Sequence, residues 1–220
     1  MTTAIIGVGT IGSTLARHLV GGDEPVVLAA KDESHAEALA LDLGPLARAA
    51  SVEYAIATAG VVVFALWLDD MKDVIAKHAD LLERKVIVDP SNPLGFDANG
   101  QIRRTLPDDQ SAGSIVASLL PAGAHYVKAF GTLSAEALAG NANRTPQRTV
   151  LFYATDDDAA AATAERLIRA AGFEPFKVGG VSAALRIEMP GGDLHQYGLN
   201  GEVLDLDEAR TAIDPKEVPA

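Results

Sequence analysis

The feature that most constrains this chain is a glycine-spaced loop that directly follows a short apolar segment at the N-terminus. Residues 4–6 are Ala-Ile-Ile, and residues 7–12 read Gly-Val-Gly-Thr-Ile-Gly, which is the G-x-G-x-x-G spacing. Between a strand and a helix, this spacing predicts a dinucleotide site in which the helix N-terminus binds the pyrophosphate. The alternative is a glycine turn with a purely structural role. The residues predicted to bind are Gly7, Val8, Gly9, Thr10, Ile11 and Gly12.

Along the rest of the chain, short apolar runs alternate with longer helical stretches. The expected strands are 4–6, 25–30, 52–54, 61–66, 85–88, 125–129, 149–154 and 174–178. The expected helices are one that begins near residue 11, then 34–43, 69–82, one around 115–120, and 157–171. Alternation of this kind predicts an α/β protein with an NAD(P)-binding Rossmann fold, whose doubly wound, mostly parallel sheet carries a small C-terminal β-α-β extension.

The same pattern suggests how the chain is divided. We expect a dinucleotide-binding domain over residues 1–140 and an extension packed on the same sheet over 141–220. Residues 94–110 are expected to form an exposed excursion, and Ser34 is expected to be the N-cap of the helix over 34–43. After Val178 the pattern decays into a Gly-rich, polar tail, which predicts too little apolar surface to pack alone and so favours a homodimer.

The end of the second strand bears on which dinucleotide is bound. NAD-binding folds place an acidic residue there, about 20 residues past the loop, to bind the ribose 2′-hydroxyl. Here Ala30 stands at that position and Lys31 follows it, so a basic side chain is available for a 2′-phosphate. We therefore predict NADP, bound by Lys31 with help from His35. Asp32 leaves the NAD alternative open, since a shift of two residues would bring it to the ribose.

Ligands in such folds lie beyond the carboxyl ends of the strands. The strands over 61–66, 85–88 and 125–129 lead into the segments 65–67, 89–93 and 128–132, which should line the nicotinamide half of the cleft. For Trp67 the alternative is a core anchor, and for Asn92, which lies between two prolines, it is a cap of its own turn. The residues predicted to line this half are Ala65, Leu66, Trp67, Asn92 and Ala129.

No catalytic residue is predicted. Lys128 is a candidate acid, but a structural role fits a strand lysine better. His195 lies in a Gly-rich loop that could reach a substrate, and Thr132 is a candidate either for the cleft or for the cap of the next helix. The histidines have no metal-ligand spacing, so no metal is expected.

The composition limits the partners. The net charge is −12, which argues against nucleic acid and against an anionic membrane surface. The chain has no cysteine, so disulfides and thiolate chemistry are excluded. We also expect no secretory leader and no membrane span, and hence a soluble cytoplasmic protein.

Three motifs in order resemble a known family: the loop 7–12, the strand and turn Val-Ile-Val-Asp-Pro-Ser-Asn-Pro at 86–93, and Val-Lys-Ala-Phe-Gly-Thr-Leu at 127–133. Together they resemble the NADPH-dependent coenzyme F420 reductases and the related cytosolic domain of the STEAP metalloreductases. The resemblance implies that Val8, Thr10 and Ile11 contact the pyrophosphate, that Lys31 contacts the 2′-phosphate, and that the segments of Trp67 and Asn92 border the nicotinamide.

The resemblance also implies a homodimer and the activity. We expect an NADP-dependent oxidoreductase that transfers a hydride between NADP(H) and a second substrate, coenzyme F420 or a flavin. Such a transfer needs two stacked rings more than a strong acid or base. The alternatives are reduction of a small carbonyl or imine, and a non-catalytic module that binds NADP(H) as a sensor or interaction partner.

Overall fold

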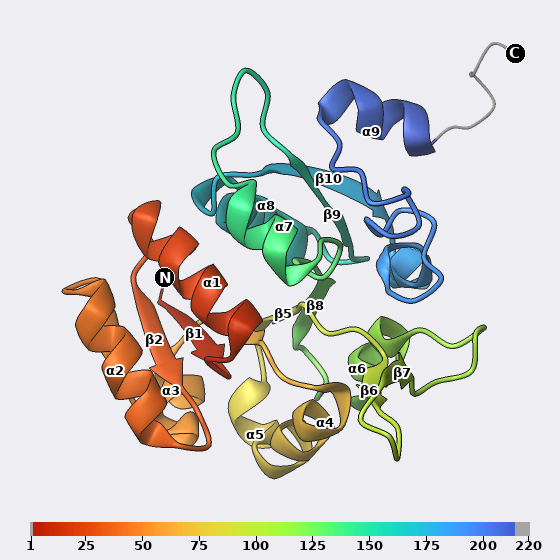
Figure 1. The fold of residues 1–220 in the computed structure, drawn as a ribbon. Helices are drawn as coiled ribbons and strands as arrows, with labels where there is room; N and C mark the ends of the chain where they lie inside the picture. Colours follow the sequence, from red (N-terminus) through yellow and green to blue (C-terminus); the bar gives the residue numbers. More distant parts are fainter. Residues whose placement is uncertain (1, 214–220) are drawn as a thin grey trace, which may run out of the picture.

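The computed structural model describes residues 2–213, and its centre is an eight-stranded sheet (Figure 1). The strands of this sheet are β1 (Thr3–Ile6), β2 (Val26–Ala29), β3 (Ala47–Ala49), β4 (Val61–Phe64), β5 (Val86–Asp89), β8 (His125–Lys128), β9 (Val150–Ala154) and β10 (Glu174–Gly179). Their order across the sheet is β10-β9-β8-β5-β4-β1-β2-β3. The six N-terminal strands are parallel and follow the order 3-2-1-4-5-6 of dinucleotide-binding folds.

The last two strands extend this sheet in the opposite direction. β9 pairs with β8 in antiparallel fashion at Lys128 and Ala154, and β10 pairs with β9 in parallel. The helix between β9 and β10 makes them the small β-α-β extension that the sequence predicts. The predicted fold class is therefore confirmed, whereas the division into two domains stays a prediction.

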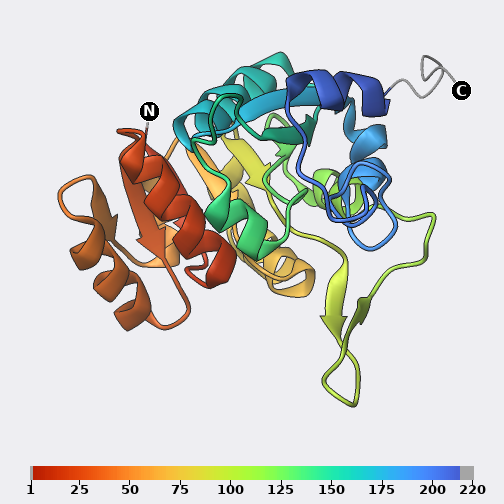
Figure 2. The ribbon, with the colours of Figure 1, turned by 45° about the horizontal axis from the view of Figure 1, so that its top comes forward.

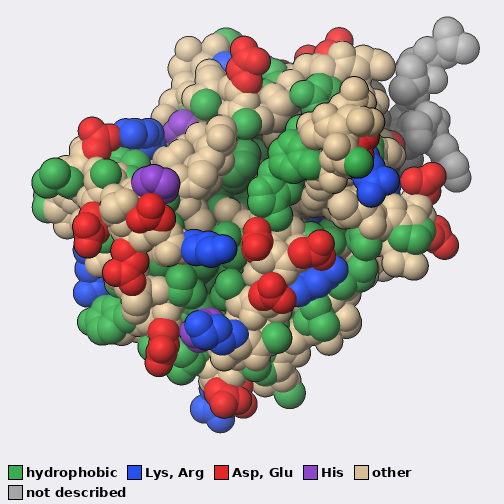
Figure 3. Space-filling model, turned by 60° about the horizontal axis from the view of Figure 1, so that its bottom comes forward, with side chains coloured by type: hydrophobic (Ala, Val, Ile, Leu, Met, Phe, Trp, Pro, Cys, Tyr) green, Lys and Arg blue, Asp and Glu red, His purple; other side chains and the backbone are tan. Residues whose placement is uncertain are grey.

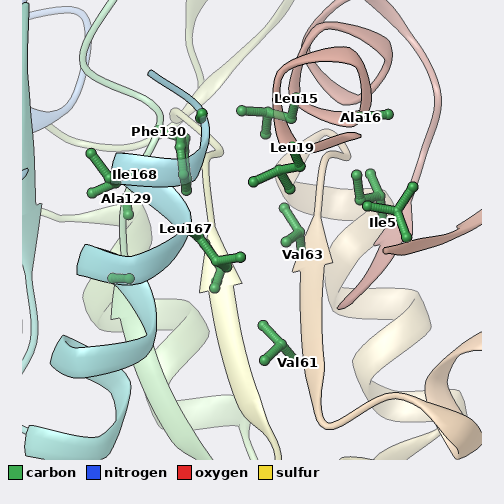
Figure 4. Close-up of a cluster of buried hydrophobic side chains, with 14 of the residues drawn as sticks. Ile5, Leu15, Ala16, Leu19, Val61, Val63, Ala129, Phe130, Leu167 and Ile168 are labelled. Atoms are coloured by element: carbon green, nitrogen blue, oxygen red, sulfur yellow. The ribbon is translucent and has the colours of Figure 1, made fainter. Parts of the chain in front are cut away.

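Helices cover both faces of the sheet. On one face lie α1 (Thr10–Gly21), α2 (Glu33–Leu43), α7 (Ala135–Gly140) and α8 (Asp158–Ala170). On the other lie α3 (Val52–Thr58), α4 (Leu68–Lys77), α5 (Ala79–Leu82) and α6 (Ala112–Leu119). Figure 4 shows Leu15 and Leu19 of α1, Leu167 of α8 and Val63 of β4 gathered between these helices and the sheet, in the first of these cores.

The side chains of the central strands alternate between the two cores. In β4, Val61 and Val63 belong to the core under α1 and α8, and Val62 and Phe64 belong to the core under α3 and α4. Because successive side chains of a strand point to opposite faces, a strand buried on both faces must be apolar throughout. This explains why the central strands read as continuous Val and Ile rather than as alternating polar and apolar residues.

Three local predictions are wrong. The expected strand over 52–54 is the start of α3, because the Ser51 hydroxyl accepts a hydrogen bond from the Tyr54 N–H (3.2 Å) and caps a helix there. The third strand lies earlier, over Ala47–Ala49. The expected helix over 69–82 is divided at His78 into α4 and α5.

The third error concerns the cap of α2. The N-cap is Asp32, not Ser34: the Asp32 carboxylate accepts hydrogen bonds from the Ser34 N–H (3.1 Å) and the Ser34 hydroxyl (2.7 Å). A carboxylate at this position also interacts favourably with the positive end of the helix dipole. These hydrogen bonds, of which the one from the Ser34 hydroxyl has the larger effect, hold the pKa of Asp32 below its usual value.

The C-terminal segment packs on the chain's own sheet, although its tail is expected to carry too little apolar surface to pack alone. It forms η1 (Val181–Ile187), a loop and α9 (Leu206–Ile213). A third core joins Ile187, Leu194 and Leu204 of this segment to Val150 and Phe152 of β9. The few apolar residues of the tail suffice because they are concentrated on β9 and β10, so the tail gives no argument for a dimer.

Within the expected exposed excursion over 94–110, residues 94–104 form a hairpin. β6 (Leu94–Phe96) and β7 (Ile102–Arg104) pair in antiparallel fashion and are separate from the main sheet. Figure 2 shows this hairpin projecting from the body of the molecule, below the blue and green helices. Over the described residues, the structure contains no helix with the length and apolar character that would let it cross a membrane.

Candidate dinucleotide site

The glycine loop lies at the carboxyl end of β1, and its first and third glycines permit close packing. Gly7 has a positive φ of 96°, and a side chain there would place its first carbon 2.3 Å from the Ala65 carbonyl oxygen. At Gly12 the same carbon would lie 1.9 Å from the Gly7 carbonyl oxygen. Any larger residue at either position would therefore push α1 or the end of β4 away from β1.

Gly9 differs from both because its first side-chain carbon would meet nothing within 4 Å. Gly9 is the N-cap of α1, where no side chain forms a capping hydrogen bond, and the first turn contains no acidic residue. The first N–H groups of a helix lack intrahelical partners and carry the positive end of its dipole. The loop therefore offers open space, uncapped N–H donors and a favourable field to an anion, and these features fit a pyrophosphate.

The end of β4 lies against this loop. A side chain on Gly7 would contact both the Ala65 carbonyl and the Leu66 side chain, so these two residues lie against the loop; whether they line the nicotinamide half of the cleft stays a prediction. Trp67 follows as the N-cap of α4, and it is 47% exposed. Its ring packs edge-to-face against Phe96 of β6, with centroids 5.4 Å apart. Trp67 is thus a surface residue beside the loop and not a core anchor.

The predicted 2′-phosphate residues lie at the end of β2. Lys31 and His35 are both exposed there. Asp32, the residue that kept the NAD alternative open, is engaged in capping α2 through its carboxylate. An acid committed to a helix cap is a poor ligand for a ribose hydroxyl, so the geometry at this strand end favours a 2′-phosphate.

Asn92 and Ala129 come together at the ends of β5 and β8. The Asn92 amide donates to the Gly131 carbonyl (3.0 Å), and its side-chain oxygen accepts from the Met189 N–H (2.8 Å). Ala129 is buried in the core, and its N–H donates to the Asp89 carbonyl (3.1 Å). Asn92 therefore joins two strand ends to the C-terminal segment, and whether it also touches the nicotinamide stays a prediction.

Lys128 lies in a buried cluster of charges instead of facing a cleft. Its ammonium donates to the Asp89 carboxylate (3.1 Å) and to the Ser91 carbonyl, and it is 3.7 Å from the Glu188 carboxylate. All three charged residues are at most 1% exposed. Burial, together with the nearby Asp89 charge, raises the pKa of Tyr126 well above its usual value, so its neutral hydroxyl donates to Asp89 (2.7 Å).

Glu188 connects this cluster to α6. One carboxylate oxygen accepts from the Ser111 hydroxyl and the Gly113 N–H, both at 2.8 Å, and the other accepts from the Ala112 N–H at 3.0 Å. The positive N-terminus of α6 thus binds this carboxylate and compensates its negative charge, which is the second one near Lys128. This arrangement is typical of a structural charge cluster, and it makes Lys128 a poor candidate for a catalytic acid.

The loop that contains His195 is hydrogen-bonded to the segment of Thr132. The Gln196 N–H donates to the Thr132 carbonyl (2.9 Å), and His195 is 1% exposed. The His195 Nδ1 accepts from the Tyr197 N–H (3.1 Å), whereas Nε2 and the Thr132 hydroxyl have no partner among residues 2–213. Burial lowers the pKa of His195 to about 4, so the ring is neutral near pH 7.

Two features of this edge, the burial of Glu188 and the hairpin, are not among the sequence predictions. Glu188 gave no signal, because a lone glutamate in a weakly patterned segment does not indicate burial. The hairpin did give one: Asn99-Gly100 stands between Phe96 and Ile102, and Asn-Gly between apolar residues is a strong hairpin signal. The Asp97 carboxylate accepts from the N–H groups of Asn99 (2.8 Å) and Gln101 (2.9 Å) and closes the turn.

Figure 3 shows the face that was at the bottom of Figure 1. Acidic (red), basic (blue) and hydrophobic (green) side chains are interspersed on it, and no large area carries charge of one sign. The strand order and the open glycine loop at the end of β1 together define a dinucleotide-binding protein of the Rossmann type.

Residues 2–93 match the family described as NADP oxidoreductase, coenzyme F420-dependent. The resemblance that the motifs predict is thereby confirmed over this part of the chain, which includes the loop 7–12 and the strand and turn 86–93. The motif at 127–133 lies beyond the match. The family supports an NADP-dependent oxidoreductase that binds NADP(H). No curated protein matches the chain.

Solved structures share the fold over most of the chain. A hypothetical protein from Sinorhizobium meliloti has 29% identity and a TM-score of 0.80, covering 93% of this chain and 95% of its own. A candidate F420-dependent NADP reductase from Arthrobacter sp. has 23% identity and a TM-score of 0.72, covering 83% and 86%. A reductive aminase from Aspergillus terreus, solved with NADPH and ethyl levulinate, has 18% identity and a TM-score of 0.63; this chain spans 59% of its length.

Proposed function

We propose that this protein transfers a hydride between NADP(H) and a ring acceptor, either a deazaflavin such as coenzyme F420 or a flavin. The observation that carries the proposal is the uncapped, open glycine loop inside the segment that matches the F420-dependent family. Bound NADPH supplies a hydride from its nicotinamide ring, which leaves NADP⁺, and the acceptor ring gains that hydride and a proton from solvent.

The protein's own contribution is position. The N-terminus of α1 holds the pyrophosphate, and Lys31 with His35 pairs with the 2′-phosphate. The segments after β4 and β5 then border the nicotinamide. A transfer between two rings gains most from holding them a few ångströms apart in a site that excludes water. This agrees with Lys128 lying in a buried, paired cluster at this edge, where it cannot serve as an exposed acid.

The test mixes the purified protein with NADPH and oxidised F420 and follows the loss of the deazaflavin's visible absorbance, with NADH as the comparison. We expect rapid loss with NADPH and slow loss with NADH. FMN takes the place of F420 in a parallel series. Binding of NADPH without its consumption by either ring would contradict the proposal and favour a sensor or interaction module.

A small carbonyl or imine is the second candidate acceptor. The reductive aminase from Aspergillus terreus shares the fold over 90% of this chain, and it was solved with NADPH and ethyl levulinate. At 18% identity the likeness concerns the fold alone, and this chain lacks a counterpart to much of that protein. Consumption of NADPH with ethyl levulinate, with or without an amine, but not with F420 or FMN would favour this acceptor class.

A further inference from the structure

An exposed apolar face lies beyond the ends of β4 and β5, which should border the nicotinamide. It consists of Trp67, which is 47% exposed, and of Phe96 and Ile102, which are each 59% exposed. Phe96 and Ile102 are direct cross-strand partners in the hairpin β6–β7, so their side chains share one side of it. We call these three side chains the aromatic face.

The aromatic face is continuous with the dinucleotide site along the chain and in space. Trp67 follows Ala65 and Leu66, the two residues that lie against Gly7. The hairpin begins five residues after Asp89, the last residue of β5. The two neighbouring strand ends that should border the nicotinamide therefore supply both aromatic rings of the face.

The hairpin is fixed at its base. The Arg104 guanidinium donates to the carbonyls of Gln110 (2.6 Å), Pro190 (2.9 Å) and Leu106 (3.1 Å), so it joins the hairpin to the C-terminal segment. The Thr105 N–H donates to the Pro93 carbonyl (2.8 Å). A two-stranded hairpin is marginal by itself in water, and these bonds hold it in place although its apolar face stays exposed.

The shape of the face suits a flat ring. The Trp67 and Phe96 rings meet at 64° and form a corner in which one ring presents its face and the other its edge. Planar conjugated rings bind aromatic side chains in both of these arrangements. A tricyclic ring placed in the corner would stack on one aromatic side chain and contact the other edge-on, next to the nicotinamide.

The size of the face also favours a small ligand over a second copy of the chain. Three side chains of this size, about half exposed, present roughly 300 Å² of surface. A stable protein interface buries about 800 Å² on each partner. Exposed patches of a few hundred Å² on monomers are often functional.

We propose that the aromatic face is the binding site for the planar ring system of the hydride acceptor, a deazaflavin or flavin. This inference rests on the proposed function and assigns its second substrate to Trp67, Phe96 and Ile102. The ring lies in the corner between Trp67 and Phe96, and Ile102 extends the apolar contact along the hairpin.

Trp67 is the only tryptophan of the chain, so its emission reports on this face alone. The experiment titrates the protein, saturated with NADP⁺ so that no turnover occurs, with oxidised F420 or with FMN. Free tryptophanamide in the same solutions corrects for absorption by the ring. We expect saturable quenching in the unaltered protein. Phe96→Ala should raise the Kd for the ring about 10-fold, and Ile102→Ala about 3-fold.

Further variants separate ring contact from disturbance of the fold. Trp67→Phe keeps an aromatic ring and should retain the affinity within about 3-fold by calorimetry, whereas Trp67→Ala should lose about 10-fold. Leu119→Ala is the matched control, because Leu119 is 46% exposed on α6 and is outside the face. The Kd for NADPH should be unchanged in Phe96→Ala, Ile102→Ala and Leu119→Ala.

The outcomes distinguish the two proposals. Ring binding that weakens in Phe96→Ala, without NADPH consumption, would support the aromatic face and refute the proposed function. Turnover with F420 or FMN whose KM is unchanged in Phe96→Ala and Ile102→Ala would support the function and refute the face. A dimer that sedimentation shows to dissociate in Phe96→Ala, with the ring Kd unchanged, would assign the face to a second copy and overturn the inference.

Discussion

Two polar regions lie at the carboxyl edge of the parallel sheet, and they differ in whether the protein itself pairs their polar groups. At the end of β1, the glycine loop leaves the N-terminus of α1 without a side-chain cap and with open space beside Gly9. At the ends of β5 and β8, Asp89, Lys128 and Glu188 are buried and bound to one another or to nearby backbone and hydroxyl groups.

The difference separates ligand sites from structure. A buried charge is tolerated only when other groups of the protein satisfy it, and such a cluster has little capacity left for a substrate. The free N–H groups of an uncapped helix N-terminus at the surface donate to water. An anion can replace that water and accept the same hydrogen bonds. Of the two regions, the glycine loop is therefore the one that is prepared for a ligand.

The largest effect should come from breaking the buried cluster. Lys128→Met leaves the carboxylates of Asp89 and Glu188 buried without their cation, which should lower the free energy of unfolding by about 3–5 kcal/mol. Urea denaturation measures this loss. Lys72→Met, at an exposed ion pair with Asp69, is the control and should cost at most about 1 kcal/mol. Full stability of Lys128→Met with lost turnover would instead make Lys128 catalytic.

Gly9→Val should abolish dinucleotide binding while the fold persists. A side chain there meets no protein atom within 4 Å, but it would occupy the position of the pyrophosphate. We expect the Kd for NADPH to rise at least about 100-fold, about 2.7 kcal/mol, by calorimetry. Gly21→Val, at the other end of α1 and equally open, should bind normally. Retained affinity in Gly9→Val would refute the site.

The hydrogen bonding of His195 is intermediate between that of the two regions. The ring is buried, but among the described residues only Nδ1 has a partner. Its pKa falls from 6.5 to about 4 on folding, so the unfolded chain binds more protons between these pH values. Stability should therefore fall as the pH drops from about 6.5 to about 4, with about 2 kcal/mol from this residue. Urea midpoints of His195→Gln should depend less on pH over this range; an unchanged pH dependence would contradict the assignment.

The smallest effect concerns the predicted 2′-phosphate site at the end of β2. Lys31→Ala should raise the Kd for NADPH about 10-fold and leave that for NADH unchanged, because only NADPH carries the 2′-phosphate. Lys77→Ala, an exposed lysine at the end of α4, is the control. Equal weakening of both cofactors by Lys31→Ala would remove the preference for NADP.

The sequence by itself determined the parallel sheet and the location of the dinucleotide loop. Both follow from local patterns: continuous apolar strands such as 61–64 indicate burial on both faces, and glycine spacing reports backbone that must approach other atoms closely. Short elements were less accessible. The strand β3 has only three residues, and the helix α3 begins at one capping hydroxyl, that of Ser51, whose signal is weaker than that of a long periodic helix.

Only the tertiary structure decided which polar residues are structural and which face solvent. The sequence gives no indication that Glu188 binds the N-terminus of α6 and approaches Lys128, because these residues are far apart in the chain and their pairing depends on how the tail crosses the sheet. Nor does it bring Trp67 against Phe96, since their contact requires the ends of two neighbouring strands to meet at one edge. Long-range contacts of this kind arise from the packing of whole elements, which local periodicity does not record.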